Sequence, residues 1–242
     1  YIGKQHVIYV IEGKNKDLYD AGVKAIKGIK YKEKKMENQF KPLLPKIIQA
    51  SETDIGYVLV LDKPKNAVLL QDLIDFLPDN TLQPKHTAWV ISSMYNIGMF
   101  LNQAGLTHNS IQASTIFVDP SEHACYLLGG WWYSVKEDTK LKAVPAEIIK
   151  ILPKKLFADK LAKTWYDRQA IKAVGINCLG DSSLLGSKLL FNKDIPKQIV
   201  HWIRTPSFDS AFEEYDGWIN VLEDSYGKRK FIEFTTDISQ IK

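Results

Sequence analysis

The chain has 242 residues, of which 45% are hydrophobic and 25% are charged, as is ordinary for a globular protein. Its 32 basic and 28 acidic side chains give a net charge of +4, which is too small for charge alone to favour nucleic acid or a membrane surface. The longest apolar run, AWVISSMYNIGMFL, is interrupted by Ser92, Ser93 and Asn96 and falls short of the roughly 20 residues of a membrane span. We therefore expect a cytoplasmic protein that does not bind membranes.

Residues 1–62 are predicted to form a small β-rich lobe with one helix. The runs HVIYVIEG, AGVKAIKGI and GYVLVLD are rich in β-branched and aromatic residues, and this composition predicts three strands. The segment KEKKMENQFKPLL, between the second and third runs, has the pattern of a helix. After the third run, the segment LDKPKN predicts a hinge over residues 63–67.

Residues 68–242 are predicted to form a larger helical lobe. Apolar residues recur every three or four positions in AVLLQDLIDFL and HTAWVISSMYNIGMFLNQAGL, and Pro84 suits the first turn of the second helix. A loop at residues 106–130 and an irregular stretch with two prolines come next. The segment YDRQAIKAVGINCLG then predicts another helix, and two further helical patches end near Tyr226.

The cysteines and histidines show no metal-site pattern. Cys125 and Cys178 stand in apolar surroundings without CxxC spacing, so we expect two reduced thiols in the core. Because the sequence begins with Tyr1 rather than Met, we expect that part of the protein's function lies outside it. Four further histidines also lack ligand spacing, and we interpret them as surface or capping groups: His6, His86, His123 and His201.

The order of these elements, and the loop LTHNSIQASTIFVDPSEHACYLLGG, resemble the protein-kinase family. The part GLTHNSIQASTIFVD is similar to the kinase catalytic loop H-R-D-L-x-x-x-x-N, with His108 in the histidine position. The part YLLGG falls where kinases have the metal-binding D-F-G motif. The resemblance implies an α+β fold with two lobes, the smaller one β-rich with one helix and the larger one α-helical.

The same alignment predicts that the catalytic groups are missing. Counted from His108, the catalytic aspartate position holds Ser110 and the metal-binding asparagine position holds Thr115. The second metal-binding aspartate position holds Leu128, and Gln112 replaces a phosphate-contacting lysine. Because phosphoryl transfer needs oxygen ligands for magnesium and a carboxylate for the attacking hydroxyl, we expect no kinase turnover.

In the small lobe, the resemblance implies a nucleotide pocket around Lys24 and Glu37. Lys24 in GVKAI takes the place of the strand lysine that contacts phosphates, and Glu37 in MENQF the place of its helix partner. Two alternatives stay open, because eight lysines fall between residues 24 and 46. They could form a solvated helix face. They could also contact nucleic acid, but we do not expect this, because few aromatic residues stand among the lysines. No G-x-G-x-x-G motif precedes them.

Asp167, near the start of its helix, matches the family's aspartate that accepts hydrogen bonds from the catalytic-loop backbone. The alternative is an ordinary acidic residue in the first turn of a helix. The resemblance also implies a glutamate further along the activation segment. That position falls at Lys155 by spacing, whereas Glu147 in VPAEI is closer by motif.

Trp131 and Trp132 follow two glycines in GGWWYSV, where a kinase holds its metal. Three interpretations stay open for them. They could plug the cleft, present an aromatic surface to a partner, or pack the segment onto the larger lobe. We favour cleft filling, since large aromatic side chains are rarely left in water.

The segments GGWWYSV, TKLKAVPAE and YGKRKFIEF resemble kinase-like proteins of phages and bacteria that also carry a J-domain. No His-Pro-Asp motif occurs in residues 1–242, so we expect any J-domain elsewhere in the full-length chain. The sequence thus predicts a pseudokinase that binds or scaffolds a protein partner, with no cofactor, although ATP could bind without magnesium. The alternative is an atypical phosphoryl- or nucleotidyl-transferase that uses Lys24.

Overall fold

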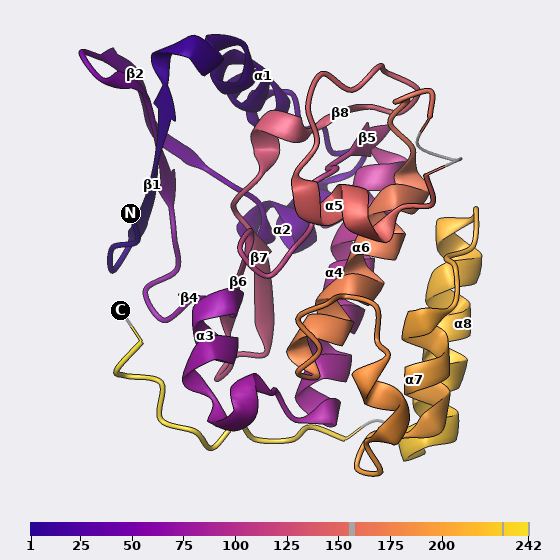
Figure 1. Cartoon of the computed structure of the whole chain (residues 1–242). Coiled ribbons are helices and arrows are strands. Elements are labelled where there is room, and N and C mark those ends of the chain that lie inside the picture. The colour runs from indigo at the N-terminus through magenta and orange to yellow at the C-terminus, as the bar shows by residue number, and fades with distance from the viewer. Residues whose placement is uncertain (155–157, 229, 242) are drawn as a thin grey trace.

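The computed structural model describes residues 1–154, 158–228 and 230–241 and has two lobes (Figure 1). A three-stranded sheet with two helices forms the smaller lobe, and helices make up most of the larger one. This arrangement confirms the predicted α+β fold class. Lys155, one of the two candidates for the activation-segment glutamate position, lies outside the described residues.

The sheet of the small lobe is antiparallel, in the order β1-β3-β2. The central strand is β3 (Gly56–Asp62), which pairs with β1 (His6–Glu12) on one side and β2 (Ile47–Thr53) on the other. Its side chains Leu59 and Leu61 are buried. The connection from β1 to β2 contains η1 (Gly13–Asn15), α1 (Lys16–Lys27), α2 (Lys34–Phe40) and η2 (Lys41–Leu43).

Two sequence predictions for this lobe were wrong, namely the strand at AGVKAIKGI and the count of one helix, since α1 and α2 are both present. The run AGVKAIKGI is not a strand, because residues 21–27 belong to α1. Tyr19, Gly22 and Ile26 are the buried residues of that helix, and their spacing of three and four outweighs the strand preference of the β-branched side chains. The second strand is instead β2, whose mostly exposed and polar residues give little strand signal.

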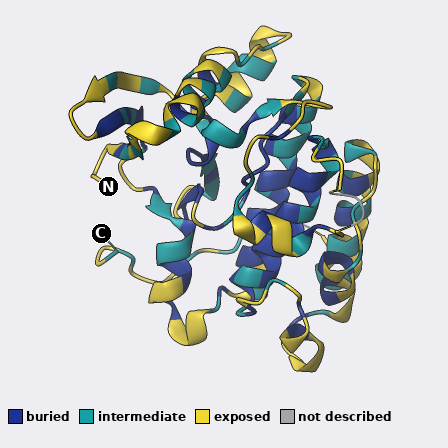
Figure 2. Ribbon diagram, turned by 45° about the horizontal axis from the view of Figure 1, so that its top comes forward, coloured by how far each residue is buried: buried dark blue, intermediate teal, exposed yellow. Residues whose placement is uncertain are grey.

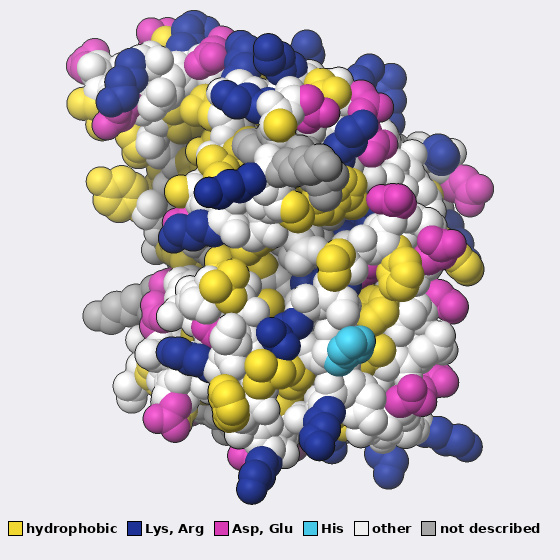
Figure 3. Space-filling view, turned by 45° about the vertical axis from the view of Figure 1, so that its right-hand side comes forward, with side chains coloured by type: hydrophobic (Ala, Val, Ile, Leu, Met, Phe, Trp, Pro, Cys, Tyr) yellow, Lys and Arg dark blue, Asp and Glu magenta, His cyan; other side chains and the backbone are white. Residues whose placement is uncertain are grey.

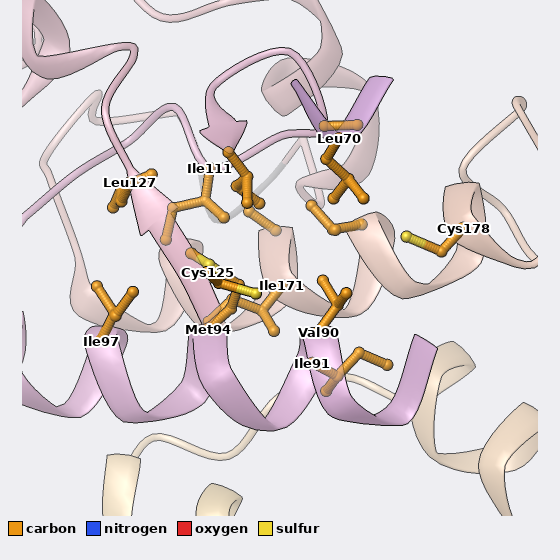
Figure 4. Packing of buried hydrophobic residues seen from close by; sticks show 14 of the residues in the cluster. Leu70, Val90, Ile91, Met94, Ile97, Ile111, Cys125, Leu127, Ile171 and Cys178 are labelled. Carbon is orange, nitrogen blue, oxygen red and sulfur yellow. The ribbon is translucent and has the colours of Figure 1, made fainter. Parts of the chain in front are cut away.

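Two long helices form the centre of the larger lobe. They are α4 (Pro84–Gln103) and α6 (Thr164–Cys178), and Pro84 stands in the first turn of α4 as predicted. The helices approach closely, since a Cβ added at Gly175 would lie 2.5 Å from Ile91 Cδ1. Side chains from α4, the strand β7 (Ala124–Leu127) and α6 meet in one cluster (Figure 4): Val90, Ile91, Met94, Ile97, Cys125, Leu127 and Ile171.

Shorter elements complete this lobe. The strands β4 (Val68–Leu69), β6 (Ile116–Asp119) and β7 form one antiparallel sheet, and β5 (Leu106–Thr107) pairs with β8 (Val135–Lys136). The further helices are α3 (Leu70–Phe76), η3 (Pro78–Asn80), η4 (Trp131–Tyr133), α5 (Ala146–Ile151), η5 (Lys188–Phe191), α7 (Lys197–Arg204) and α8 (Ala211–Tyr226). The predicted helices at α3, α4 and α6 and the two patches that end near Tyr226 are confirmed.

A buried ion pair joins the helices of this lobe. Lys172 of α6 and Glu214 of α8 are fully buried, with Nζ and Oε1 3.0 Å apart. Tyr95 of α4 donates a hydrogen bond to Glu214 at 2.7 Å, and the indole N–H of Trp202 in α7 donates to Tyr95 at 3.2 Å. Because each partner is hydrogen-bonded, this network satisfies charges that would be costly to leave alone in the interior.

The surface carries charges of both signs, scattered over the face shown in Figure 3. Beneath it, α4 and α6 are largely buried (Figure 2). After α8 the chain runs along the base of the larger lobe and ends on the side where the N-terminus lies (Figure 1). None of the helices in the described ranges combines the length and the hydrophobicity that crossing a membrane requires.

Candidate functional site

The loop after β5 is held by Asp167 of α6. One carboxylate oxygen accepts a hydrogen bond from the backbone N–H of His108 at 2.6 Å, and the other accepts from Asn109 at 2.7 Å. Burial raises the pKa of Asp167 to about 6, while these two hydrogen bonds act in the opposite direction. The contacts lie where the kinase resemblance implies them, and they fix the start of the loop to the central helix.

The side chain of His108, at the start of this loop, lies wholly inside the protein. Its ring packs edge-on against Trp131, with the ring centroids 5.2 Å apart. Burial lowers the pKa of His108 to about 3, and the nearby backbone of Gly129 opposes this shift. Neither ring nitrogen makes a hydrogen bond of good geometry within the described residues. The side chain is therefore a neutral packing group at pH 7.

Ser110 and Thr115 are both buried, and neither hydroxyl faces open solvent. A Cβ added at Gly130 would lie only 2.7 Å from Ser110 Oγ, so the segment after β7 rests directly on this serine. Thr115 Oγ1 lies 2.8 Å from the carbonyl oxygen of Ser110 and accepts a hydrogen bond from the backbone N–H of Gln112. Ser110 and Thr115 are thus close together, and both side chains contact neighbouring segments of the same chain.

Gln112 and the buried Leu128 line two different hollows. Gln112 is half-buried and lines a groove of about 350 Å³ between α3, α5 and α6. Leu128 lines a larger hollow that lies beside the connection from α1 to α2. The neighbouring position 129 is directed toward Thr115. A Cβ added at Gly129 would be 3.0 Å from Thr115 Cα. Gly129 therefore contacts Thr115, whereas Leu128 lines the hollow together with residues 62–65.

The predicted pair of Lys24 and Glu37 does not exist. Lys24 stands on α1, not on a strand, and its side chain is exposed. Glu37 of α2 forms ion pairs with Lys34 at 2.9 Å and Lys41 at 2.7 Å. Hydrogen bonds from Lys41 and then Lys34 lower the pKa of Glu37 to about 2. These lysines and Glu37 form a local charged helix surface, which was one of the alternatives left open by the sequence.

Tyr9 of β1 contacts the segment after β7. Its hydroxyl oxygen would be 2.9 Å from a Cβ added at Gly129, and its ring meets Trp132 edge-on at 5.0 Å. Burial raises the pKa of Tyr9, so the phenol stays neutral. The run VIYVI is apolar throughout, so the sequence gives no signal that distinguishes Tyr9 from its neighbours.

The two tryptophans pack between the lobes. Trp131 is fully buried, and its indole N–H donates a hydrogen bond to the Leu127 carbonyl at 2.8 Å. Trp132 is half-buried between Tyr9 and α1, where a Cβ added at Gly22 would lie 3.2 Å from the Trp132 backbone nitrogen. The segment that would bind metal in a kinase therefore packs against both lobes.

The hollow beside Leu128 has a volume of about 940 Å³. Five lysines line it, of which Lys34, Lys41 and Lys46 pair with acidic side chains. Lys63 instead donates hydrogen bonds to carbonyl oxygens of the connection 63–67. Within the described part of the chain, no three His, Cys, Asp or Glu side chains gather as a metal centre would require.

Comparisons with known proteins agree with the two-lobed architecture. No protein-family profile matches the sequence, and no curated protein matches it either. Among solved structures, the chain is similar to vaccinia related kinase 3, with a TM-score of 0.60 and 15% sequence identity. The match covers 90% of this chain and 79% of that one. At this identity the likeness shows the fold alone, which is the protein-kinase fold.

Proposed function

We propose that this chain is a catalytically inactive kinase-like module, a pseudokinase, that acts by binding a protein partner. The observation that carries the proposal is that other residues cover the Ser110 position. Gly130 rests on Ser110, and Trp131 fills the space next to it. A phosphate group and its metal ions would need that space.

The side chains around this position also favour inactivity. Phosphoryl transfer requires oxygen ligands for magnesium and a carboxylate that orients the attacking hydroxyl. Ser110 has no carboxylate and its hydroxyl is a weak metal ligand, and the hydroxyl of Thr115 is engaged with the loop backbone. Tyr9, with its raised pKa, supplies a neutral phenol and no positive charge for phosphates. Removal of one catalytic acid or base typically costs a factor of 10² to 10⁴.

Exposed apolar side chains support the binding of a protein partner. Around η5, Leu185 is 61% exposed and Phe191 is 87% exposed, and Phe212 at the start of α8 is 69% exposed. Figure 3 shows hydrophobic side chains at several places on the face that includes α7 and α8. Each of these side chains can contribute buried apolar area to an interface with a partner.

The test is phosphate transfer from labelled ATP and magnesium to generic protein substrates and to the chain itself. We expect background rates for the wild type, for Ser110→Ala and for the surface control Lys24→Ala. Ser110→Ala should fold normally, because the Ser110 hydroxyl has no hydrogen-bonding partner within the described residues. Magnesium-dependent transfer that disappears in Ser110→Ala and persists in Lys24→Ala would overturn the proposal.

The alternative transferase that uses Lys24 gains no support, since this side chain is exposed on α1.

The proposal includes the compartment in which the chain works. Cys125 and Cys178 are both buried and free, which suits a reducing compartment such as the cytoplasm. A J-domain elsewhere in the full-length chain would provide a chaperone connection for the partner that this module binds.

A further inference from the structure

A second hollow lies on the larger lobe, away from the catalytic-type loop. It has a volume of about 430 Å³, within the range of small-molecule sites. One face of α4 forms its floor, and the end of α8 with the chain that follows forms its wall. Lysines and aromatic rings from these two elements, together with His123, line the hollow.

The charged residues that line this hollow are all positive. They are Lys85, Lys228 and Lys230, and no Asp or Glu is found among its described lining residues. All three lysines are exposed, and none forms an ion pair with another residue in the described ranges. Three unpaired cations around one hollow favour an anionic ligand with several oxygen acceptors, such as a phosphate group.

Aromatic rings form the other part of the lining. His123 stacks between Trp89, with centroids 4.8 Å apart, and Phe231, with centroids 4.4 Å apart. The indole N–H of Trp89 donates a hydrogen bond to the His123 carbonyl at 2.6 Å, which fixes this arrangement. Phe231 is 72% exposed, so it can stack with a further planar group. A planar ring is therefore the second chemical feature that this site would recognise.

His86 supplies hydrogen-bonding capacity that the protein does not use. The residue is only 4% exposed, it lines the hollow, and its ring nitrogens have no hydrogen-bonding partner among the described residues. Burial and then His123 lower the pKa of His86, so at pH 7 its ring offers one donor and one acceptor. The prediction that His86 is a surface or capping group was wrong. Its ring instead meets His123 and Phe234 edge-on.

We propose that this hollow binds a small molecule that carries a phosphate group on a planar ring system, of which a nucleoside monophosphate is the simplest form. The three lysines hold the phosphate, the exposed ring of Phe231 stacks with the base, and His86 hydrogen-bonds with its polar edge. The site is separate from the closed position around Ser110, and it needs no magnesium. It therefore does not depend on whether the chain transfers phosphate.

The test is calorimetric titration of the whole chain with AMP, without metal, beside adenosine and inorganic phosphate. We expect saturable binding of AMP and at least tenfold weaker binding of the two fragments, because each lacks one of the two recognised features. The triple variant Lys85→Gln, Lys228→Gln, Lys230→Gln should weaken AMP binding at least tenfold. The matched control carries the same charge change on exposed lysines of the small lobe: Lys24→Gln, Lys27→Gln and Lys30→Gln.

Each outcome decides the proposal. The proposal is supported if the control variant binds AMP within twofold of the wild type while the variant of Lys85, Lys228 and Lys230 binds it at least tenfold more weakly. Phe231→Ser should weaken AMP binding without unfolding the chain, since this ring is mostly exposed. The proposal is overturned if AMP binding does not saturate, if the first triple variant binds as well as the wild type, or if phosphate alone binds as tightly as AMP.

Discussion

Replacement of Trp131 by alanine measures how far the segment after β7 stabilises the two-lobed fold. The side chain is fully buried, packs edge-on against His108 and donates a hydrogen bond to the Leu127 carbonyl. Core truncations of this kind cost about 3 to 5 kcal/mol, and the lost hydrogen bond is included in that range. We expect Trp131→Ala to lower the free energy of unfolding by this amount. Trp132→Ala should cost less, because Trp132 is only half-buried.

The assay is urea unfolding followed by circular dichroism, with a thermal melt as a second measurement. For a chain of this size, each kcal/mol lowers Tm by about 2 to 4 °C, so the melt should shift by roughly 6 to 20 °C. Phe212→Ala is the matched control, since Phe212 is also aromatic but 69% exposed. Its substitution should change stability by no more than about 0.5 kcal/mol.

Two results would refute this reasoning. One is a change below about 1 kcal/mol for Trp131→Ala, which would mean that the ring does not fill the cleft in solution. The other is easy quenching by iodide of the fluorescence that this substitution removes. A partner surface would behave in that way, because exposed indoles are accessible to iodide before the protein unfolds. The same variant would then lose the interaction while keeping its melting temperature.

Three further predictions address the neighbouring contacts. Gly130→Ala should destabilise the fold by at least about 1 to 2 kcal/mol, because Gly130 has φ +78° and an added Cβ would meet Ser110. Adding Ser110→Gly should recover part of that loss in a double-mutant cycle of urea midpoints, and strictly additive effects would contradict the packing. Lys172→Met should cost about 3 to 5 kcal/mol by leaving Glu214 buried without its partner, and Lys172→Met with Glu214→Leu should cost less; equal losses would refute the ion-pair explanation. The pKa of Asp167 is about 6 in the folded protein and about 3.9 in unfolded chains, so the folded state holds more protons between these values. The unfolding free energy of the wild type minus that of Asp167→Asn should therefore fall as pH rises from about 4 to 6, and a flat difference would contradict the raised pKa.

The helical lobe could be predicted from the sequence because its signals extend over many residues. In α4 and α6 the apolar spacing continues for several turns, and Pro84 marks the first turn of α4. The small lobe gave short and mixed signals. Val23 and Ile26 suggested a strand, yet tertiary burial of one helix face determined the structure. Local composition therefore failed where an element has only a few turns.

The sequence indicated which residues of the candidate site lie together, but not how they contact the rest of the chain. Spacing from His108 selected Ser110 and Thr115, and the structure brings the two residues together. It could not show that Gly129, rather than Leu128, faces Thr115, because the direction of a side chain after a strand depends on the local backbone. Tyr9 was missed since aromatic residues are common in strands and carry no functional signal there.

The arrangement around Asp167 shows how the loop after β5 is held in place through its backbone. Asp167 binds the loop through the backbone N–H groups of His108 and Asn109, so this anchor does not depend on the identity of the loop side chains. Trp131 packs on His108 from the other side, and Gly130 covers Ser110. A carboxylate at position 110 would be buried under that cover, and burial of an unpaired charge costs several kcal/mol. The packing around Ser110 therefore favours a small, uncharged side chain at this position.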